Sequence, residues 1–197
     1  MSRQFFGTDG IRGLANQEPL TPETALRLGQ AAAEVLLSGE NADEFPRCII
    51  GRDTRSSGNM LESALAAGMA SVGVDVELAG VIPTPAVAYL TKNSGAAIGV
   101  VISASHNPFH DNGIKFFGPD GYKLSDETEL AIEKSLLGSD RIDSGSRAPA
   151  GKVGRITNLD DAKDRYVHAV LDGLKTDSKF LEGMKVVLDC ANGASYE

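Results

Sequence analysis

Residues 96–108, AAIGVVISASHNP, decide how the rest of the chain is interpreted. The first seven residues are apolar, and such a run next to turn residues predicts a buried strand. Pro108 lacks a backbone N–H and disfavours a helical conformation in the residue before it. The strand should therefore end in an irregular loop over 103–108. In the following stretch DNGIKFF, residues 111–113 indicate a turn and residues 114–117 a second strand.

Polar side chains gather in this loop, where Ser105, His106 and Asn107 follow the strand and Lys115 comes shortly after. Open α/β sheets bind ligands at such strand ends, so we expect the site here. A serine hydroxyl is a weak nucleophile, which needs a base or donors around the group it carries. Neighbours in an extended chain point in opposite directions, so we do not expect a Ser105–His106 dyad. The loop is better suited to holding a phosphoryl group, and a plain polar turn is the alternative.

A second loop, GRDTRSS at 51–57, lies between a predicted buried strand at 48–50 and a predicted helix. A strand–loop–helix unit can offer backbone N–H groups to an anion. Alternatively, Asp53 pairs with Arg52 or Arg55, and one of the two serines that end the loop caps the helix. We favour this structural role, in which residues 51–57 support the loop at 103–108 that carries Ser105 (the serine loop) and do not react themselves.

The remaining pattern alternates helices with short strands, as in an α/β protein. Further helices are predicted from Thr21 to Gly39 and over 83–90, 126–137 and 162–174, further strands over 74–79 and 185–190, and a linker over 138–154. The strand at 185–190 should be buried, but no partner for it follows in the sequence. We therefore expect the chain to be a fragment that stops inside a second domain.

Composition narrows the function further. A formal net charge of −8 over 197 residues argues against a nucleic-acid groove, so an anion would need local cations such as Arg12 and Lys115. Cys48 and Cys190 are expected to be two buried thiols in a reduced cytosol. No signal peptide or membrane-spanning run is evident, so a cytoplasmic protein without membrane contact is predicted. Pro108 between His106 and His110 disfavours a zinc site on a helix.

Four ordered motifs carry a family resemblance: FGTDGIRG (6–13), GRDTR (51–55), SASHNP with DNGIKF (103–116), and VLDCANGA (187–194). Together they resemble the α-D-phosphohexomutases over nearly the whole chain. Ser103 and the opening motif are most similar to the bacterial branch that acts on glucosamine phosphates. The resemblance implies a three-layer α/β/α fold with a mixed sheet for residues 1–150. A second, similar domain would then begin within 151–197.

The same resemblance implies the chemistry. Phosphorylated Ser105 would interconvert glucosamine 6-phosphate and glucosamine 1-phosphate through a sugar bisphosphate, a step toward cell-wall precursors. Arg12, His106 and Lys115 would be catalytic, and these three together with Asn107 would contact the substrate. His110 has no role that the resemblance transfers. The same kind of enzyme acting on glucose or mannose phosphates is the nearest alternative.

The family also implies Mg²⁺, with the Ser105 phosphate as one ligand and three aspartates from a D-G-D-x-D-R loop. That loop is absent from this sequence, so we expect little or no metal binding and negligible activity from this stretch alone. A homodimer formed through the first domain is likewise implied. A non-catalytic phosphosugar-binding module is an alternative from another class. A serine hydrolase is less favoured, because the sequence has no G-x-S-x-G motif.

Overall fold

The computed structural model describes residues 4–37, 46–138, 147–174 and 179–197. Seven strands form one sheet in the order β1-β2-β6-β5-β3-β4-β7. The strands are β1 (Phe6–Gly7), β2 (Gly10–Leu14), β3 (Arg47–Arg52), β4 (Asp75–Val81), β5 (Ile98–Ile102), β6 (Asp111–Phe117) and β7 (Ile156–Asn158). The helices are α1 (Pro22–Leu36), α2 (Gly58–Ser71), α3 (Thr84–Ser94), α4 (Asp126–Gly138) and α5 (Ala162–Leu174), with a 3₁₀ turn at Ala150–Lys152.

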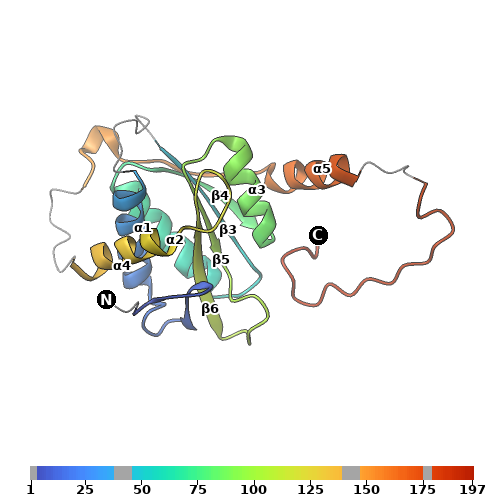
Figure 1. The fold of residues 1–197 in the computed structure, drawn as a ribbon, viewed down its shortest axis with the longest axis horizontal. Coiled ribbons are helices and arrows are strands. Elements are labelled where there is room, and N and C mark those ends of the chain that lie inside the picture. The colour runs from blue at the N-terminus through green and yellow to red at the C-terminus, as the bar shows by residue number, and fades with distance from the viewer. Residues whose placement is uncertain (1–3, 38–45, 139–146, 175–178) are drawn as a thin grey trace.

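The sheet is mixed, because β3 is parallel to β4 and β5 whereas β6 runs antiparallel to β5 and β2. Figure 1 shows α1, α2 and α4 on one face and α3 and α5 on the other. Alternate residues of β3 serve the two faces, since Cys48 and Ile50 pack in the larger core cluster and Ile49 packs in the smaller one. The predicted three-layer α/β/α fold with a mixed sheet is therefore confirmed.

The start of α1 follows the sequence signals. The Thr21 hydroxyl accepts a hydrogen bond from the Thr24 N–H at 3.2 Å, and Pro22 is the first helical residue. The predicted end of this helix at Gly39 lies outside the described residues.

Ser57 precedes α2 but makes no side-chain capping bond there, so the expected capping of α2 by a serine of the loop at 51–57 is wrong. The Ser57 hydroxyl instead accepts a hydrogen bond from the Asn112 side chain at 2.8 Å.

The turn expected at 111–113 is also wrong, because these residues open strand β6. Asp111 pairs with Leu14 and Gly113 with Arg12 in the antiparallel ladder with β2. The opening motif thus supplies a partner strand, and this long-range pairing overrides the local turn preference of Asp-Asn-Gly. The chain reverses earlier, where the Asp111 N–H donates to the Pro108 carbonyl at 3.0 Å.

Residues 185–190 are not the buried strand that their apolar pattern predicts. The segment is irregular, and the Val187 and Leu188 residues are 98% and 80% exposed. Cys190 accordingly lies at intermediate exposure, whereas Cys48 is buried as expected. An apolar run becomes a strand only where a neighbour completes its hydrogen-bond ladder, and among the described residues no strand lies beside this segment.

Strand β7 was not anticipated from the sequence. Ile156, Thr157 and Asn158 pair in parallel with β4, so the sheet extends beyond the predicted linker. The described part of that linker, from 147 onward, packs against the fold. The Gly154 N–H donates to the Ala70 carbonyl at 2.9 Å, and no room remains for a side chain, because a Cβ on Gly154 would lie 1.9 Å from the Val74 carbonyl oxygen.

Helices α1 and α2 approach so closely that glycine is required at their contact. A Cβ on Gly68 would lie 2.1 Å from the carbonyl oxygen of Leu26, which is backbone and cannot rotate away. We expect Gly68→Ala to lower the free energy of unfolding by about 1–3 kcal/mol, the usual cost of overpacking. Gly173→Ala in α5 is the control, because no atom lies within 4 Å of that position. Urea unfolding should separate the two variants, and equal stabilities would contradict the prediction.

Candidate active site

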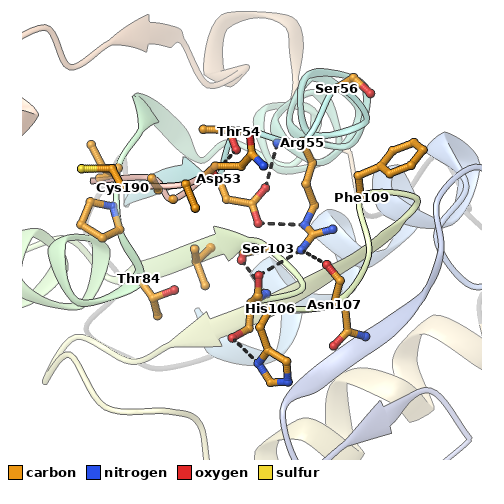
Figure 2. Close-up of a pocket in the computed structure, with 18 residues that line it drawn as sticks. Asp53, Thr54, Arg55, Ser56, Thr84, Ser103, His106, Asn107, Phe109 and Cys190 are labelled. Carbon is orange, nitrogen blue, oxygen red and sulfur yellow. Dashed lines mark hydrogen bonds and ion pairs between the residues drawn. The ribbon is translucent and has the colours of Figure 1, made fainter. Parts of the chain in front are cut away.

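The candidate site lies where three parallel strands end. β3, β4 and β5 finish at Arg52, Val81 and Ile102, and their carboxyl ends meet at one edge of the sheet. The loops that follow line a cavity of about 910 Å³. Figure 2 shows these side chains around it. The lining residues include Asp53, Thr54, Arg55, Thr84, Ser103, Ser105, His106, Asn107, Phe109 and residues 190–194.

Ser105 is exposed and lines this cavity. Its backbone has φ = 56°, in the left-handed region that residues other than glycine rarely adopt, at a cost of roughly 1–3 kcal/mol. The Ser105 N–H donates to the Ser103 hydroxyl at 3.0 Å. The serine therefore sits on a sharp turn that presents its hydroxyl to solvent.

We did not expect Ser105 and His106 to form a dyad, and the structure contradicts this expectation. The Ser105 Oγ and His106 Nδ1 atoms are 3.3 Å apart. Neighbouring side chains point in opposite directions only along an extended chain, and the left-handed conformation of Ser105 breaks that alternation. The imidazole can therefore exchange a proton with a group at the serine oxygen.

Asn107 also lines the cavity and its side-chain amide donates to the Asp111 carboxylate at 3.0 Å. Phe109, at the tip of the same loop, is 82% exposed and stacks edge-on against His110, with 5.4 Å between ring centroids. The Asp111 carboxylate lies 3.9 Å from the His110 ring. These contacts place His110 on the outer side of the loop.

The two expected cations lie beside the loop, on neighbouring strands. Arg12 in β2 and Lys115 in β6 both face Asp9, at 3.6 Å and 3.4 Å. Lys115 is on an interior strand of the sheet, because β6 lies between β2 and β5. Neither cation is among the residues that line the cavity. The structure thus brings Ser105, His106 and Asn107 together and places Arg12 and Lys115 in a separate cluster around Asp9.

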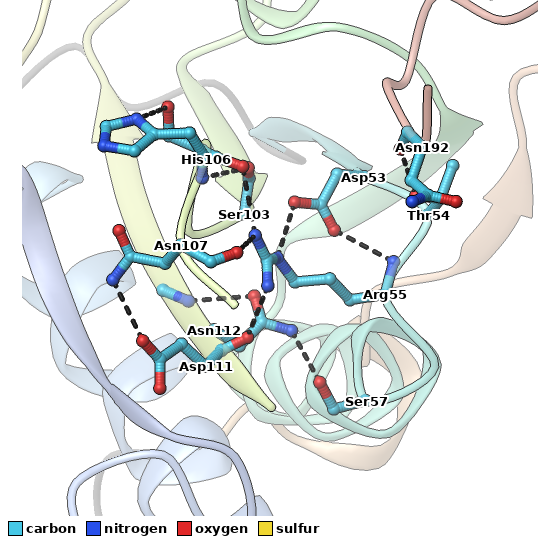
Figure 3. A network of polar contacts seen from close by, with 12 residues as sticks. Asp53, Thr54, Arg55, Ser57, Ser103, His106, Asn107, Asp111, Asn112 and Asn192 are labelled. Carbon is cyan, nitrogen blue, oxygen red and sulfur yellow. Dashed lines mark hydrogen bonds and ion pairs between the residues drawn. The ribbon is translucent and has the colours of Figure 1, made fainter. Parts of the chain in front are cut away.

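The expected pairing of Asp53 with an arginine of the GRDTR loop is confirmed. Asp53 pairs with Arg55 at 2.9 Å, and Arg55 reaches the serine loop (Figure 3). Arg52 points away and donates through Nε to Glu62 at 3.1 Å. Burial raises the pKa of the Glu62 carboxyl, and the adjacent Arg52 opposes this shift only in part.

Sequence reasoning missed two walls of the cavity. Thr84 follows β4 and begins α3, and residues 190–194 also line the cavity, where the Thr54 hydroxyl donates to the Asn192 carbonyl. The parallel order of β3, β4 and β5 is the signal that would have included Thr84. No comparable signal places 190–194, because this segment lies far along the chain and outside the sheet.

Metal binding receives no support from the described residues, which contain no group of three or more His, Cys, Asp or Glu side chains placed to hold an ion.

Burial, and secondarily the charge of Glu77, raises the pKa of the Cys48 thiol well above its ordinary value, so this thiol is inert. No described helix combines the length and apolar character needed to cross a membrane.

The fold and the site together define a class of protein. It is a three-layer α/β/α domain with an exposed serine at one edge of its sheet. Residues 3–142 match the family described as phosphoglucomutase/phosphomannomutase, alpha/beta/alpha domain I. The chain belongs to this family.

Curated relatives extend the similarity across the whole chain. The chain is 52% identical over 197 residues to a phosphoglucosamine mutase of Erythrobacter litoralis and 55% identical over 194 residues to one of Sphingopyxis alaskensis. It covers 42% of the length of each of these relatives, and they cover 100% and 98% of this chain. Among solved structures, a putative phosphomannomutase from Thermus thermophilus superposes with a TM-score of 0.74 at 31% identity, covering 95% of this chain and 39% of that one.

Proposed function

We propose that the protein is a phosphoglucosamine mutase that interconverts glucosamine 6-phosphate and glucosamine 1-phosphate. The observation that carries the proposal is the exposed Ser105 hydroxyl, held on a left-handed turn at the cavity and 3.3 Å from an imidazole. The names of the relatives that match this chain end to end support the aminosugar as substrate. The mutase would be an isomerase that works by phosphoryl transfer.

In the proposed mechanism, the phosphoryl group on Ser105 moves to the free hydroxyl of the sugar monophosphate. The bond between phosphorus and the serine oxygen breaks, a bond to the sugar oxygen forms, and the proton of that hydroxyl passes through His106 to the leaving serine oxygen. The bisphosphate then turns over in the site and returns its other phosphoryl group to Ser105, and the serine proton passes back through His106 to the sugar oxygen that leaves. Positioning and charge stabilisation supply most of the catalysis in such transfers.

Arg12, Lys115 and Asn107 would bind the substrate in this proposal. The two cations would meet the negative charge of a migrating phosphoryl group, and the amide of Asn107 would hydrogen-bond to the sugar phosphate. Both cations already lie at one point, around Asp9, which supports a shared anion as their ligand.

Properties of the whole protein form part of the same proposal. Mg²⁺ suits an oxygen-only site that includes the seryl phosphate, but the described residues do not supply its other ligands, so no step above depends on it. We propose a cytoplasmic homodimer that forms through the first domain, and negligible mutase activity from this stretch alone. A division into residues 1–150 and 151–197 stays a prediction, and it has to accommodate β7, which pairs with β4 across that boundary.

A panel of sugar phosphates tests the substrate. Assayed with glucosamine, glucose and mannose 6-phosphates, the protein at its full natural length should show its highest kcat/KM with the glucosamine ester. A phosphoglucomutase or phosphomannomutase is the second candidate, because a solved structure with the same fold at 31% identity carries the phosphomannomutase name. A preference for glucose or mannose 6-phosphate would overturn the aminosugar assignment and leave the phosphoserine mechanism in place.

A further inference from the structure

The guanidinium group of Arg55 hydrogen-bonds to backbone carbonyls along the serine loop (103–108) and at the start of β6. Arg55 donates through Nη2 to the carbonyl oxygens of Ser105 and Asn107, at 3.0 Å and 2.9 Å. Through Nη1 it donates to the carbonyl oxygen of Pro108 and, at 3.0 Å, to that of Asp111. Figure 3 shows this side chain reaching from the end of β3 into the loop that follows β5.

The charge of Arg55 is buried and compensated. Its side chain is only 8% exposed, and its Nε donates to Asp53 at 2.9 Å. The other Asp53 carboxylate oxygen accepts the backbone N–H of Arg55 at 3.0 Å, which fixes the carboxylate against the chain. A guanidinium has five donors in a rigid fork, so one side chain can serve a carboxylate and several carbonyls together. A lysine ammonium, with three donors at one point, cannot span this arrangement.

The serine loop needs these side-chain hydrogen bonds because its own backbone forms few hydrogen bonds within the loop. Within the turn the Asn107 N–H donates to the Ala104 carbonyl and the Asp111 N–H to the Pro108 carbonyl, both at 3.0 Å. Ser105, inside the first of these two turns, occupies the left-handed conformation that a serine does not favour. A conformation of this kind persists only when its surroundings over-determine it.

We propose that Arg55 is a positioning residue which, oriented by Asp53, holds the Ser105 turn in the conformation that presents the hydroxyl to substrate. The inference rests on the proposed function for its catalytic consequence, but the mechanical part stands on the contacts alone. Arg55 itself does not touch the reacting atoms in this account. It acts by fixing the carbonyl of the serine that does.

Amide hydrogen exchange of the full-length protein tests the mechanical part. In Arg55→Lys, which keeps the charge and loses the fork, the amides of Asn107 and Asp111 should exchange at least about tenfold faster than in the wild type. Arg52→Lys is the matched control, because Arg52 binds Glu62 and makes no contact with the loop among its described interactions. Arg52→Lys should lower the urea midpoint while the two loop amides keep their wild-type exchange.

Kinetics test the catalytic part. Arg55→Lys should lower kcat by about 10²-fold with KM nearly unchanged, because a misplaced nucleophile affects the transfer step more than binding. Arg55→Met should behave alike if it folds. A lower global stability with wild-type exchange at Asn107 and Asp111 would overturn the inference and leave Arg55 a general structural residue. If the wild type shows no mutase activity, the proposed function fails, whereas faster loop exchange would still establish the positioning role.

Discussion

Ser105→Ala is expected to abolish both the phosphorylated form of the full-length protein and its mutase activity. The hydroxyl is the atom that carries the phosphoryl group between the two sugar positions, and His106 cannot replace it as the returning carrier. Loss of a covalent nucleophile should lower kcat by on the order of 10⁴-fold or more. Intact mass after incubation with a glucosamine bisphosphate should show one phosphate on the wild type and none on the variant.

Ser103→Ala separates the two hydroxyls of the loop. Ser103 accepts the Ser105 N–H at 3.0 Å, so its loss should loosen the turn without removing the carrier. This control should still gain one phosphate on incubation with the bisphosphate. If the phosphate persisted in Ser105→Ala and disappeared in Ser103→Ala, Ser103 would be the phosphoryl carrier and the assignment to Ser105 would be wrong. A wild type that gains none would favour a binding module.

Much of the scaffold could be predicted because local signals and tertiary structure agree there. The apolar run at 98–102 became the buried strand β5, and Thr21 and Pro22 began α1 as expected. The errors arose where a distant partner decides the conformation. Asp111–Gly113 form part of β6 because β2 pairs with them, and 185–190 form no strand because no described neighbour pairs with them.

The site shows the same division. Its position at the carboxyl end of β5 and its serine, histidine and asparagine followed from the order of motifs along the chain. The contact between Ser105 and His106 did not, because it depends on one left-handed backbone angle. Nor did the reach of Arg55 into the serine loop, because it depends on the parallel pairing of β3 with β5. Periodicity predicts elements, whereas these contacts depend on how the elements are placed together.

Arg12 should have the next largest effect on catalysis after Ser105. Gly113 places it beside the serine loop, since Arg12 pairs with Gly113 and the Gly113 carbonyl accepts the Ser103 N–H at 2.9 Å. The Arg12 Nε atom is buried and has no hydrogen-bond partner among the described residues. Its ion pair with Asp9 is long, at 3.6 Å, and the Asp9 side chain is 57% exposed. A phosphate with two negative charges can therefore displace Asp9 at low cost.

Arg12→Met should consequently lower kcat/KM by about 10²–10³-fold, the usual effect of removing one group that stabilises developing charge. Arg12→Lys should fall between this variant and the wild type, because it keeps the charge and loses the bidentate geometry. Asp9→Asn is the discriminating control in steady-state assays at fixed ionic strength. If Asp9 is only a displaceable counter-ion, its removal should lower KM and change kcat by less than about threefold. If Asp9→Asn is as damaging as Arg12→Met, the three charges anchor the β1–β2 hairpin, and Arg12 does not bind the phosphoryl group.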